Sequence, residues 1–478
     1  MSDAATLGRF SCFVAGQSVG GPEVLQVRHP YDGALVGEVA LATAEHTEAA
    51  IIAALSSVEP PKRFERSQVL EKARALLEAR REEFARTITS EAGLCMRESR
   101  YEVGRALDVL RFAAMEALRD DGQVFSCDIS PQGKARKIVT MREPARCVAA
   151  ITPFNHPLNQ VAHKVAPAIA AGAPVILKPS EKTPITALCF AALLYEAGLP
   201  GSMLSVLLGP TREVAEMLVK DDRVDVVTFT GSVAVGKRIA ATAGYKRVVL
   251  ELGGNDPLIV FEDADMDLAV TLAAEGSYRN SGQRCTAVKR ILVQESILEG
   301  FTDRLVRKTG EYVSGDPFAE ATRVGTVIDE ASAGYLETVV REAVAAGARV
   351  RAGGGRRGAL LEPTVIDRVP RDCRMVVSES FGPLAPVIGF KDFEDAMGLA
   401  NGTAYGLSSG VVTNRLDVAL GAVRRLRCGT VNINEVPGFR VENSPFGGIK
   451  DSGLGVKEGV IEAMKSFSTI KTFSLPWI

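Results

Sequence analysis

Apolar positions divide the chain into a helical first quarter and a longer part in which strands alternate with helices. Between residues 46 and 120, apolar residues recur at helical spacing, for example at Val69, Ala73, Leu76 and Leu77. From residue 146 onward, short apolar runs such as CVAAI, PVILK and VDVVTF are separated by helical patterns such as ITALCFAALLYEAG. Alternation of this kind is typical of a parallel sheet covered by helices on both faces. We therefore expect an α/β protein with a doubly wound, nucleotide-binding first sheet.

Two segments predict a small β element outside the main sheets. RKIVTMREP alternates and ends at Pro144, which indicates a strand hairpin over about 123–143. The C-terminal SFSTIKTFSLPWI alternates like a strand with no local partner, and association can cover such an edge. A second α/β series follows the glycines at 253 and 254. We expect a first domain from 1–122 and 144–251, a second domain from 252–436, and a bridging element from 123–143 and 437–478.

Composition narrows the functional classes. The 478 residues suffice for two or three domains, and 46% hydrophobic with 24% charged residues is ordinary for a globular protein. A net charge of −2 provides no basic field for nucleic acid. The N-terminus carries an early acid, and the longest apolar stretch is broken by proline and glycine, so neither a signal peptide nor a membrane span is expected. The eight cysteines form no CxxC pair or histidine cluster. We expect a cytoplasmic protein without disulfides or a metal.

The segment FTGSVAVGKR resembles a phosphate-binding loop without being a complete one. Gly231, Gly236 and Lys237 have the spacing of a P-loop, but Arg238 stands where that loop needs serine or threonine for magnesium. NTP binding is therefore disfavoured. The backbone N–H groups at the following helix, near Ser232, suit a cofactor pyrophosphate. An ordinary strand–turn–helix remains the alternative.

The segment VILKPSEKTP ends a predicted strand with Lys178, followed by Glu181. At the carboxyl end of a parallel strand, a lysine and a carboxylate can bind ribose hydroxyls. A carboxylate there also repels a 2′-phosphate, which favours NAD over NADP, although NADP stays possible. The alternative is a solvated charged turn.

Two further positions carry reactive groups. Glu251 lies within the aliphatic run VVLELGG, and burial there would raise its pKa towards the range of a general base. A charge at a strand end is the alternative interpretation. Cys285, in NSGQRCTAVKR, lies in a loop of small polar residues. A cysteine attacks carbonyl groups as a thiolate, and Arg284 beside it can favour that form.

Taken together, these segments resemble the aldehyde dehydrogenase superfamily. TPFN, KPSEKTP, FTGSVAVG, ELGG, GQRC, ESFGPL and SPFGGIKDSG occur in the family's order over nearly the whole chain. The resemblance implies NAD(P)-dependent oxidation of an aldehyde to a carboxylate. It also implies a Rossmann-like cofactor domain, an α/β catalytic domain and a small β oligomerisation element that builds a homodimer or homotetramer.

The resemblance also assigns roles to individual residues. Cys285 is the nucleophile, Asn155 with the Cys285 backbone N–H forms the oxyanion hole, and Glu251 activates the hydrolytic water. The expected cofactor contacts are Thr152, Pro153, Lys178, Glu181, Gly231, Ser232, Gly236, Glu379 and Phe381. Two positions depart from the family. The family commonly has Trp-Asn-Phe-Pro where this chain has residues 154–157, so His156 replaces an aromatic wall of the substrate pocket with a titratable ring. Thr469 aligns with a glutamate of the family's last strand, so a proton relay through that position is not expected.

Charged residues beside the nucleophile predict an anionic substrate. Arg284 and His156 are costly to place in an apolar pocket, and they suit phosphonate or phosphate oxygens. Arg105 falls where related enzymes for anionic aldehydes carry a pocket arginine, and Arg440 is a further candidate. The motifs most closely resemble those of phosphonoacetaldehyde dehydrogenases.

Other functions stay open at this point. Non-phosphorylating glyceraldehyde-3-phosphate, lactaldehyde and sulfoacetaldehyde dehydrogenases are alternatives to phosphonoacetaldehyde oxidation. Transfer of the acyl group to coenzyme A is opposed by Glu251. A catalytically silent or nucleotide-binding protein is the non-redox alternative.

Overall fold

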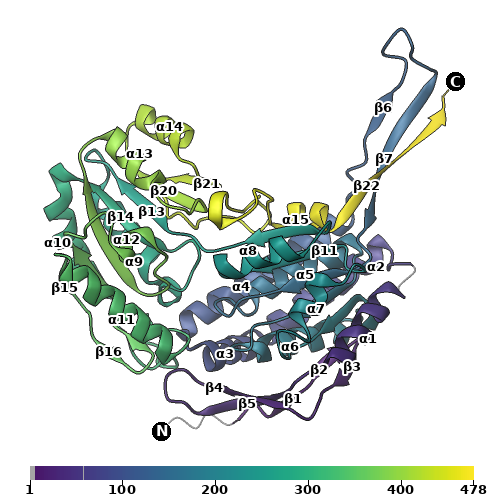
Figure 1. Ribbon diagram of the computed structural model, residues 1–478, viewed down its shortest axis with the longest axis horizontal. Helices are drawn as coiled ribbons and strands as arrows, with labels where there is room; N and C mark the ends of the chain where they lie inside the picture. Colours follow the sequence, from purple (N-terminus) through teal and green to yellow (C-terminus); the bar gives the residue numbers. More distant parts are fainter. Residues whose placement is uncertain (1–5, 57–58, 478) are drawn as a thin grey trace.

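The computed structural model describes residues 6–56 and 59–477 and consists of two α/β lobes with a projecting β arm (Figure 1). The first five residues, on which the expectation of no signal peptide partly rests, lie outside the described part. No helix within the described ranges is long and apolar enough to cross a membrane.

The first lobe is built on a seven-stranded sheet in the order β12-β11-β8-β9-β10-β2-β3. Strands β12 to β10 are parallel, and β2 and β3 are added antiparallel at one edge. β9, the next strand in the chain, lies on one side of β8, and β11 lies on the other side. The crevice beyond the carboxyl end of β8 is therefore a topological switch point, where sheets of this kind bind ligands. The strands are β2 (Cys12–Val14), β3 (Gln17–Val19), β8 (Val148–Ile151), β9 (Val175–Lys178), β10 (Leu204–Val206), β11 (Val226–Thr230) and β12 (Arg247–Glu251).

Helices cover this sheet, and the predicted helical first quarter forms α1 to α4. The helical pattern that contains Val69 and Leu77 breaks at Arg80 into two helices. A small sheet in the order β1-β5-β4 lies near the N-terminus. Its strands are β1 (Arg9–Phe10), β4 (Val24–Arg28) and β5 (Leu35–Ala40), and the helices are α1 (Ala44–Leu55), α2 (Arg63–Ala79), α3 (Arg81–Ala92), α4 (Met96–Ala117), α5 (Asn159–Ala171), α6 (Pro184–Glu196), α7 (Ala215–Lys220) and α8 (Val233–Thr242).

The second lobe has its own seven-stranded sheet, in the order β15-β18-β19-β14-β13-β20-β21. Alternate residues of β13 enter separate apolar clusters on the two faces: Leu258 and Val260 on one, Ile259 on the other. The strands are β13 (Asp256–Val260), β14 (Val288–Gln294), β15 (Arg349–Ala352), β18 (Thr364–Asp367), β19 (Leu384–Phe390), β20 (Ser408–Val412) and β21 (Thr430–Ile433). The covering helices are α9 (Met266–Tyr278), α10 (Leu298–Thr309), α11 (Glu330–Ala345), α12 (Arg374–Val377), α13 (Phe393–Asn401) and α14 (Leu416–Arg425), and β16 (Arg356–Arg357) pairs with β17 (Leu360–Leu361).

The arm extends away from both lobes, and the C-terminal strand runs along it towards its outer end (Figure 1). It contains β6 (Val124–Ser126), β7 (Arg136–Pro144) and β22 (Ser468–Pro476), which follows α15 (Val460–Ser466). The C-terminal strand, expected to have no local partner, pairs antiparallel with the distant β7, from Ser468 opposite Pro144 to Pro476 opposite Arg136. The two strands are more than 300 residues apart in the chain.

Candidate active site

The candidate site lies where the two sheets meet. Glu251 is the last residue of β12, at the carboxyl edge of the first sheet, and Asn155 follows β8 at the same edge. Cys285 precedes β14, at the amino edge of the second sheet. A late segment of the chain closes over the base, because Glu251 forms a β-bridge with Gly453. The segments that carry these residues are in contact, because Asn155 donates to the Gln283 carbonyl and Gly254 lies against the Cys285 carbonyl.

The loop before Cys285 has an unusual backbone. Asn280, Ser281 and Gly282 all have positive φ, at 57°, 52° and 70°. A Cβ on Gly282 would lie 2.0 Å from a backbone oxygen of Gly382, so only glycine fits there. Side-chain amides fasten the loop to the segment after β8: Asn280 Nδ2 donates to the Asn155 carbonyl at 3.0 Å, and Asn155 Nδ2 donates to the Gln283 carbonyl at 2.8 Å. The predicted oxyanion residue is thus held directly against the nucleophile loop.

Cys285 is a half-buried thiol with charges of both signs nearby. Burial raises the pKa of Cys285 to about 11, and the ammonium of Lys289 opposes this shift, as does Arg440 more weakly. Lys289 is the strongest cationic influence on the thiol, whereas the sequence offered Arg284 as one source of such a field. Sequence reasoning missed Lys289. The available signal was a lysine within the predicted strand VKRILVQ. In the structure only 2% of this lysine is exposed.

Glu251 is a buried carboxyl group close to the Lys164–Glu458 ion pair. The residue is 3% exposed, and neither carboxylate oxygen has a hydrogen-bond partner among the described residues. Burial, followed by the nearby Glu458, raises the pKa of Glu251 well above its usual range, and Lys164 partly offsets this. Lys164 donates to Thr228 Oγ1 at 2.9 Å and to Glu458 Oε1 at 2.5 Å. A carboxyl group with a raised pKa is suited to accept a proton from water near neutral pH.

Lys164 and Glu458 were also missed from the sequence. Lys164 lies on α5 in the segment VAHKVAPAIAA, which is apolar apart from this lysine and the histidine before it. A lysine in such a segment is the sequence signal for a buried ion pair, and the structure buries it fully. Thr469, the position considered for a relay residue, lies in the arm opposite Glu143. The charged group next to Glu251 is instead supplied by Glu458, from the segment before α15.

Two adjoining cavities lead from the first sheet to Cys285. One, of about 450 Å³, is lined by the predicted cofactor residues Thr152, Lys178, Glu181 and Ser232. The other, of about 520 Å³, includes Asn155, Cys285, Glu379 and Phe381 in its lining. Pro153, Phe154, Thr230, Gly231 and Ser232 line both. A long, continuous crevice of this kind fits a dinucleotide with its reactive end at the thiol.

The walls of the crevice carry the polar groups that a dinucleotide needs. Ser232 caps α8, with its Oγ accepting from the Val235 N–H at 3.4 Å, so the helix N-terminus opens on the cavity. Gly236, on α8, leaves room for Leu252, because a Cβ there would lie 2.4 Å from a Leu252 methyl group. Lys178 forms an ion pair with Glu181, and Glu379 pairs with Lys289.

The two residues after Leu252 are glycines because neighbouring atoms leave no room for a side chain at either position. A Cβ on Gly253 would lie 2.3 Å from Glu379 Oε2, and one on Gly254 would lie 2.5 Å from the Cys285 carbonyl oxygen. The Gly254 N–H donates to Glu379 Oε1 at 3.1 Å. Glycine at both positions therefore lets the base segment, the nucleophile and Glu379 approach one another.

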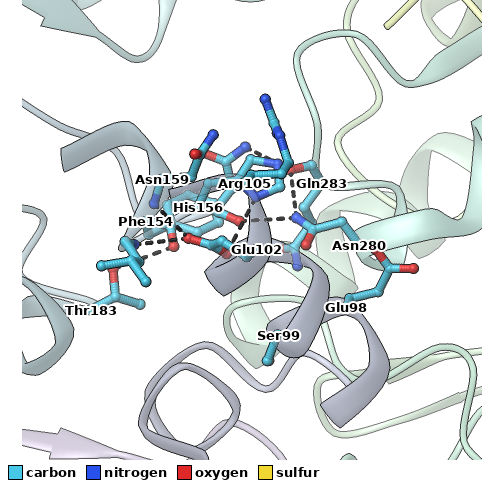
Figure 2. A network of polar contacts seen from close by, with 12 residues as sticks. Glu98, Ser99, Glu102, Arg105, Phe154, His156, Asn159, Thr183, Asn280 and Gln283 are labelled. Atoms are coloured by element: carbon cyan, nitrogen blue, oxygen red, sulfur yellow. Dashed lines mark hydrogen bonds and ion pairs between the residues drawn. The ribbon is translucent and has the colours of Figure 1, made fainter. Parts of the chain in front are cut away.

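The four predicted substrate residues have different charge environments. Arg105, on α4, pairs with Glu442, with Nε 2.5 Å from Oε1, and His163 Nε2 contacts the other oxygen of this carboxylate at 2.5 Å. His156 lies 3.4 Å from Glu102, and Figure 2 shows these residues facing one another between α4 and the segment after β8. Glu102 also accepts from two backbone N–H groups at the start of α5.

Arg284 and Arg440 lack carboxylate partners among the described residues. Arg284 Nη2 donates to the Gly276 carbonyl at 3.1 Å, and its buried Nε has no partner. The Arg440 guanidinium stacks 3.9 Å from the Phe446 ring centroid and leaves Nη1 buried without a partner. Burial lowers the pKa of Arg284 to about 10, and both arginines interact electrostatically with Cys285. No group of three or more His, Cys, Asp or Glu within residues 6–56 and 59–477 is arranged to hold a metal ion.

Comparison with known proteins agrees with this geometry. The model of the aldehyde dehydrogenase family matches residues 15–473. A 3-sulfolactaldehyde dehydrogenase from Priestia aryabhattai is 38% identical over 460 residues, which cover 96% of each chain. Aldehyde dehydrogenase 21 from Physcomitrella patens, solved with its reaction product succinate, is 36% identical, covers 99% of each chain and has a TM-score of 0.95. Glyceraldehyde-3-phosphate dehydrogenase from Methanocaldococcus jannaschii, solved with NADP, is 35% identical, covers 95% of this chain and 99% of its own, and has a TM-score of 0.90.

These matches run along nearly the whole chain and are close in both sequence and structure. They confirm the predicted α/β fold. We conclude that the chain belongs to the aldehyde dehydrogenase family and is an NAD(P)-dependent enzyme.

Proposed function

We propose that the enzyme oxidises a small aldehyde carrying an anionic group, with Cys285 as nucleophile, Glu251 as base and Asn155 in the oxyanion hole. The observation that carries the anionic preference is the pair Arg284 and Arg440. Both guanidinium groups have a buried N–H without a partner among the described residues. Buried cations of this kind are stabilised by an anion that accepts from them. The other residues of the site act in two successive reaction steps.

In the first step, the Cys285 thiol gives its proton to solvent water and its sulfur bonds to the aldehyde carbon. Asn155 Nδ2 and the Cys285 backbone N–H stabilise the oxygen that gains the negative charge. When bound, NAD(P) supplies the hydride acceptor, and Lys178, Glu181, Ser232 and Glu379 are the residues that would hold it. A thioester on Cys285 then remains.

In the second step, Glu251 takes a proton from water, whose oxygen attacks the thioester carbon. The carbon–sulfur bond breaks, and the carboxylate product and the free thiol are released. The raised pKa of Glu251 suits this role, because an ordinary carboxylate is too weak a base. Lys164 favours the ionised form of Glu251, which can accept a proton, whereas the nearby Glu458 carboxylate favours the protonated form.

Among anions, we favour a sulfonate over the phosphonate suggested by the motifs. Glu442 pairs with Arg105 and contacts His163, whereas Arg284 and Arg440 form no direct ion pair with a carboxylate of the described residues. A monoanion needs fewer free cations than a dianion. The 38% identity to a 3-sulfolactaldehyde dehydrogenase supports the same choice. Phosphonoacetaldehyde and glyceraldehyde 3-phosphate are the second candidates, favoured if Arg105 and His156 also contact the substrate.

The test is steady-state kinetics on a panel of aldehydes with NAD and with NADP. The panel contains 3-sulfolactaldehyde, sulfoacetaldehyde, phosphonoacetaldehyde, glyceraldehyde 3-phosphate and succinic semialdehyde, with lactaldehyde and propanal as neutral controls. We expect kcat/KM to be highest for a sulfonated aldehyde. An equal or higher kcat/KM for propanal would refute the anionic preference. A higher value for phosphonoacetaldehyde would refute only the choice of anion.

We further propose that the arm mediates homo-oligomer formation, as a dimer or tetramer. It exposes the apolar side chains Val124, Phe125, Ile138, Met141, Ile470, Phe473, Leu475 and Trp477. An exposed apolar strand edge is a typical association surface. The double variant Phe473→Asp/Leu475→Asp should lower the molar mass measured by sedimentation equilibrium, and an unchanged mass would refute the role of this surface.

A further inference from the structure

Lys289 is a buried cation to which the chemistry above gives no direct part. It lies on β14, four residues after Cys285, and only 2% of it is exposed. Its Nζ donates to the Gly254 carbonyl at 2.8 Å and to the Cys285 carbonyl at 3.1 Å, and it pairs with Glu379. One ammonium group thus joins the turn after β12, the nucleophile loop and the loop before β19.

These contacts use the full donor capacity of the ammonium group. A lysine has three N–H donors, and the three partners are all protein oxygens. No donor remains for a substrate, so Lys289 acts through the groups it holds. The missing side chain of Gly254 is what allows the approach, since a Cβ there would lie 2.5 Å from the Cys285 carbonyl oxygen.

The charges around the thiol oppose one another. Asp256 and Glu379 raise the pKa of Cys285, whereas Lys289 and Arg440 lower it. Asp256 is itself buried and accepts from Ser408, and burial raises its pKa to about 7. Lys289 has two effects here: its own charge favours the thiolate, and its ion pair offsets the nearby carboxylate of Glu379.

We propose that Lys289 is a positioning residue that fixes the Cys285 and Gly254 carbonyls and Glu379 relative to one another and sets the nucleophilicity of the Cys285 thiol. This inference rests on the proposed function, because it takes Cys285 as the nucleophile and Glu379 as a cofactor ligand. It adds a link between them: the residue that holds the cofactor ligand also supports the thiolate.

The test measures the thiol itself, in the full-length enzyme without cofactor or substrate. Alkylation of Cys285 by iodoacetamide is followed between pH 6 and 11, with the Cys285 peptide quantified by mass spectrometry so that the other seven cysteines do not interfere. Because iodoacetamide reacts with the thiolate, the rate reports its fraction. Loss of a nearby opposite charge shifts a pKa by about 1 to 3, so Lys289→Met should slow alkylation at pH 8 at least about tenfold.

Two further lysine variants separate charge from general disturbance. Lys289→Arg keeps the positive charge and should restore the alkylation rate to within about threefold of the wild type. Lys308→Met is the matched control, since Lys308 lies on α10 and pairs with Glu311 at 2.8 Å. It should leave the rate unchanged. A Lys289→Met enzyme that is alkylated at the wild-type rate would overturn the proposal.

Glu379→Gln provides an independent test if Lys289→Met fails to fold. Removing the carboxylate leaves Lys289 in place and should speed alkylation at pH 8, which is the opposite direction to Lys289→Met. A slower or unchanged rate in this variant also overturns the proposal. Because alkylation requires no aldehyde, the aldehyde panel and the thiol measurement can fail separately, and each failure identifies which of the two inferences is wrong.

Discussion

Replacing Arg284 by methionine tests whether an uncompensated charge beside the nucleophile selects the substrate. Methionine keeps an apolar stem and removes the guanidinium, whose Nε is buried without a partner among the described residues. A hydrogen bond to a charged group contributes about 1.5 to 3 kcal/mol. At about 1.4 kcal/mol for each factor of ten, kcat/KM for a sulfonated aldehyde should fall about 10- to 140-fold. For propanal, which has no anionic group, we expect a change of less than about threefold.

The same variant should not be less stable than the wild type. Burial lowers the pKa of Arg284 to about 10, which means that the folded state disfavours its charge. Arg284→Met should therefore unfold at the same or a higher temperature in differential scanning calorimetry. Arg105→Met is the contrasting variant, because it leaves Glu442 without its partner at 2.5 Å and should lower stability. The reasoning would be refuted if Arg284→Met lowered kcat/KM equally for sulfonated and neutral aldehydes. It would also be refuted if only Arg105→Met lowered kcat/KM specifically for anionic aldehydes.

Three other changes test the remaining parts of the site. Glu251→Gln should accumulate a thioester on Cys285, detectable by intact-mass spectrometry, and lower the steady-state rate about 10²- to 10⁴-fold. Because the pKa of Glu251 is raised and only its ionised form accepts a proton, wild-type hydrolysis should accelerate as pH rises through that pKa, and the variant should lose this limb of the pH profile. Glu181→Ala should improve kcat/KM for NADP at least about tenfold relative to NAD, and an unchanged ratio would exclude Glu181 as the selective group. Gly254→Ala should reduce activity at least about tenfold because its Cβ would lie 2.5 Å from the Cys285 carbonyl oxygen, whereas Gly300→Ala, with no atom within 4 Å of the new Cβ, should match the wild type.

The sequence was informative where chemistry is encoded by neighbouring residues. The strand–helix alternation predicted the first sheet, and the motifs around Cys285, Glu251 and Asn155 lie in segments that the structure brings into contact. Local patterns work here because strand ends and glycine turns determine where these side chains lie.

Partners from distant segments could not be predicted in this way. Lys164 meets Glu458 across 294 residues, and Arg105 meets Glu442 across 337. A single sequence indicates that a charge lies in an apolar pattern, but not which opposite charge it meets. The pairing of Glu442 with Arg105 therefore altered the expected charge around Arg105, and the register of β22 against β7 could not be read from either segment alone.

The crossing of the late Gly453 segment over Glu251 has a consequence for the order of synthesis. Cys285 and Glu251 leave the ribosome well before Glu442, Gly453 and Glu458, and domains begin to fold as they emerge. Before these residues are made, Arg105 and Lys164 lack the carboxylates with which they form ion pairs. The β-bridge between Gly453 and Glu251 is also missing. A growing chain therefore contains Cys285 and Glu251 before it contains the residues that complete their surroundings, so the arrangement described above requires the late segment of the chain.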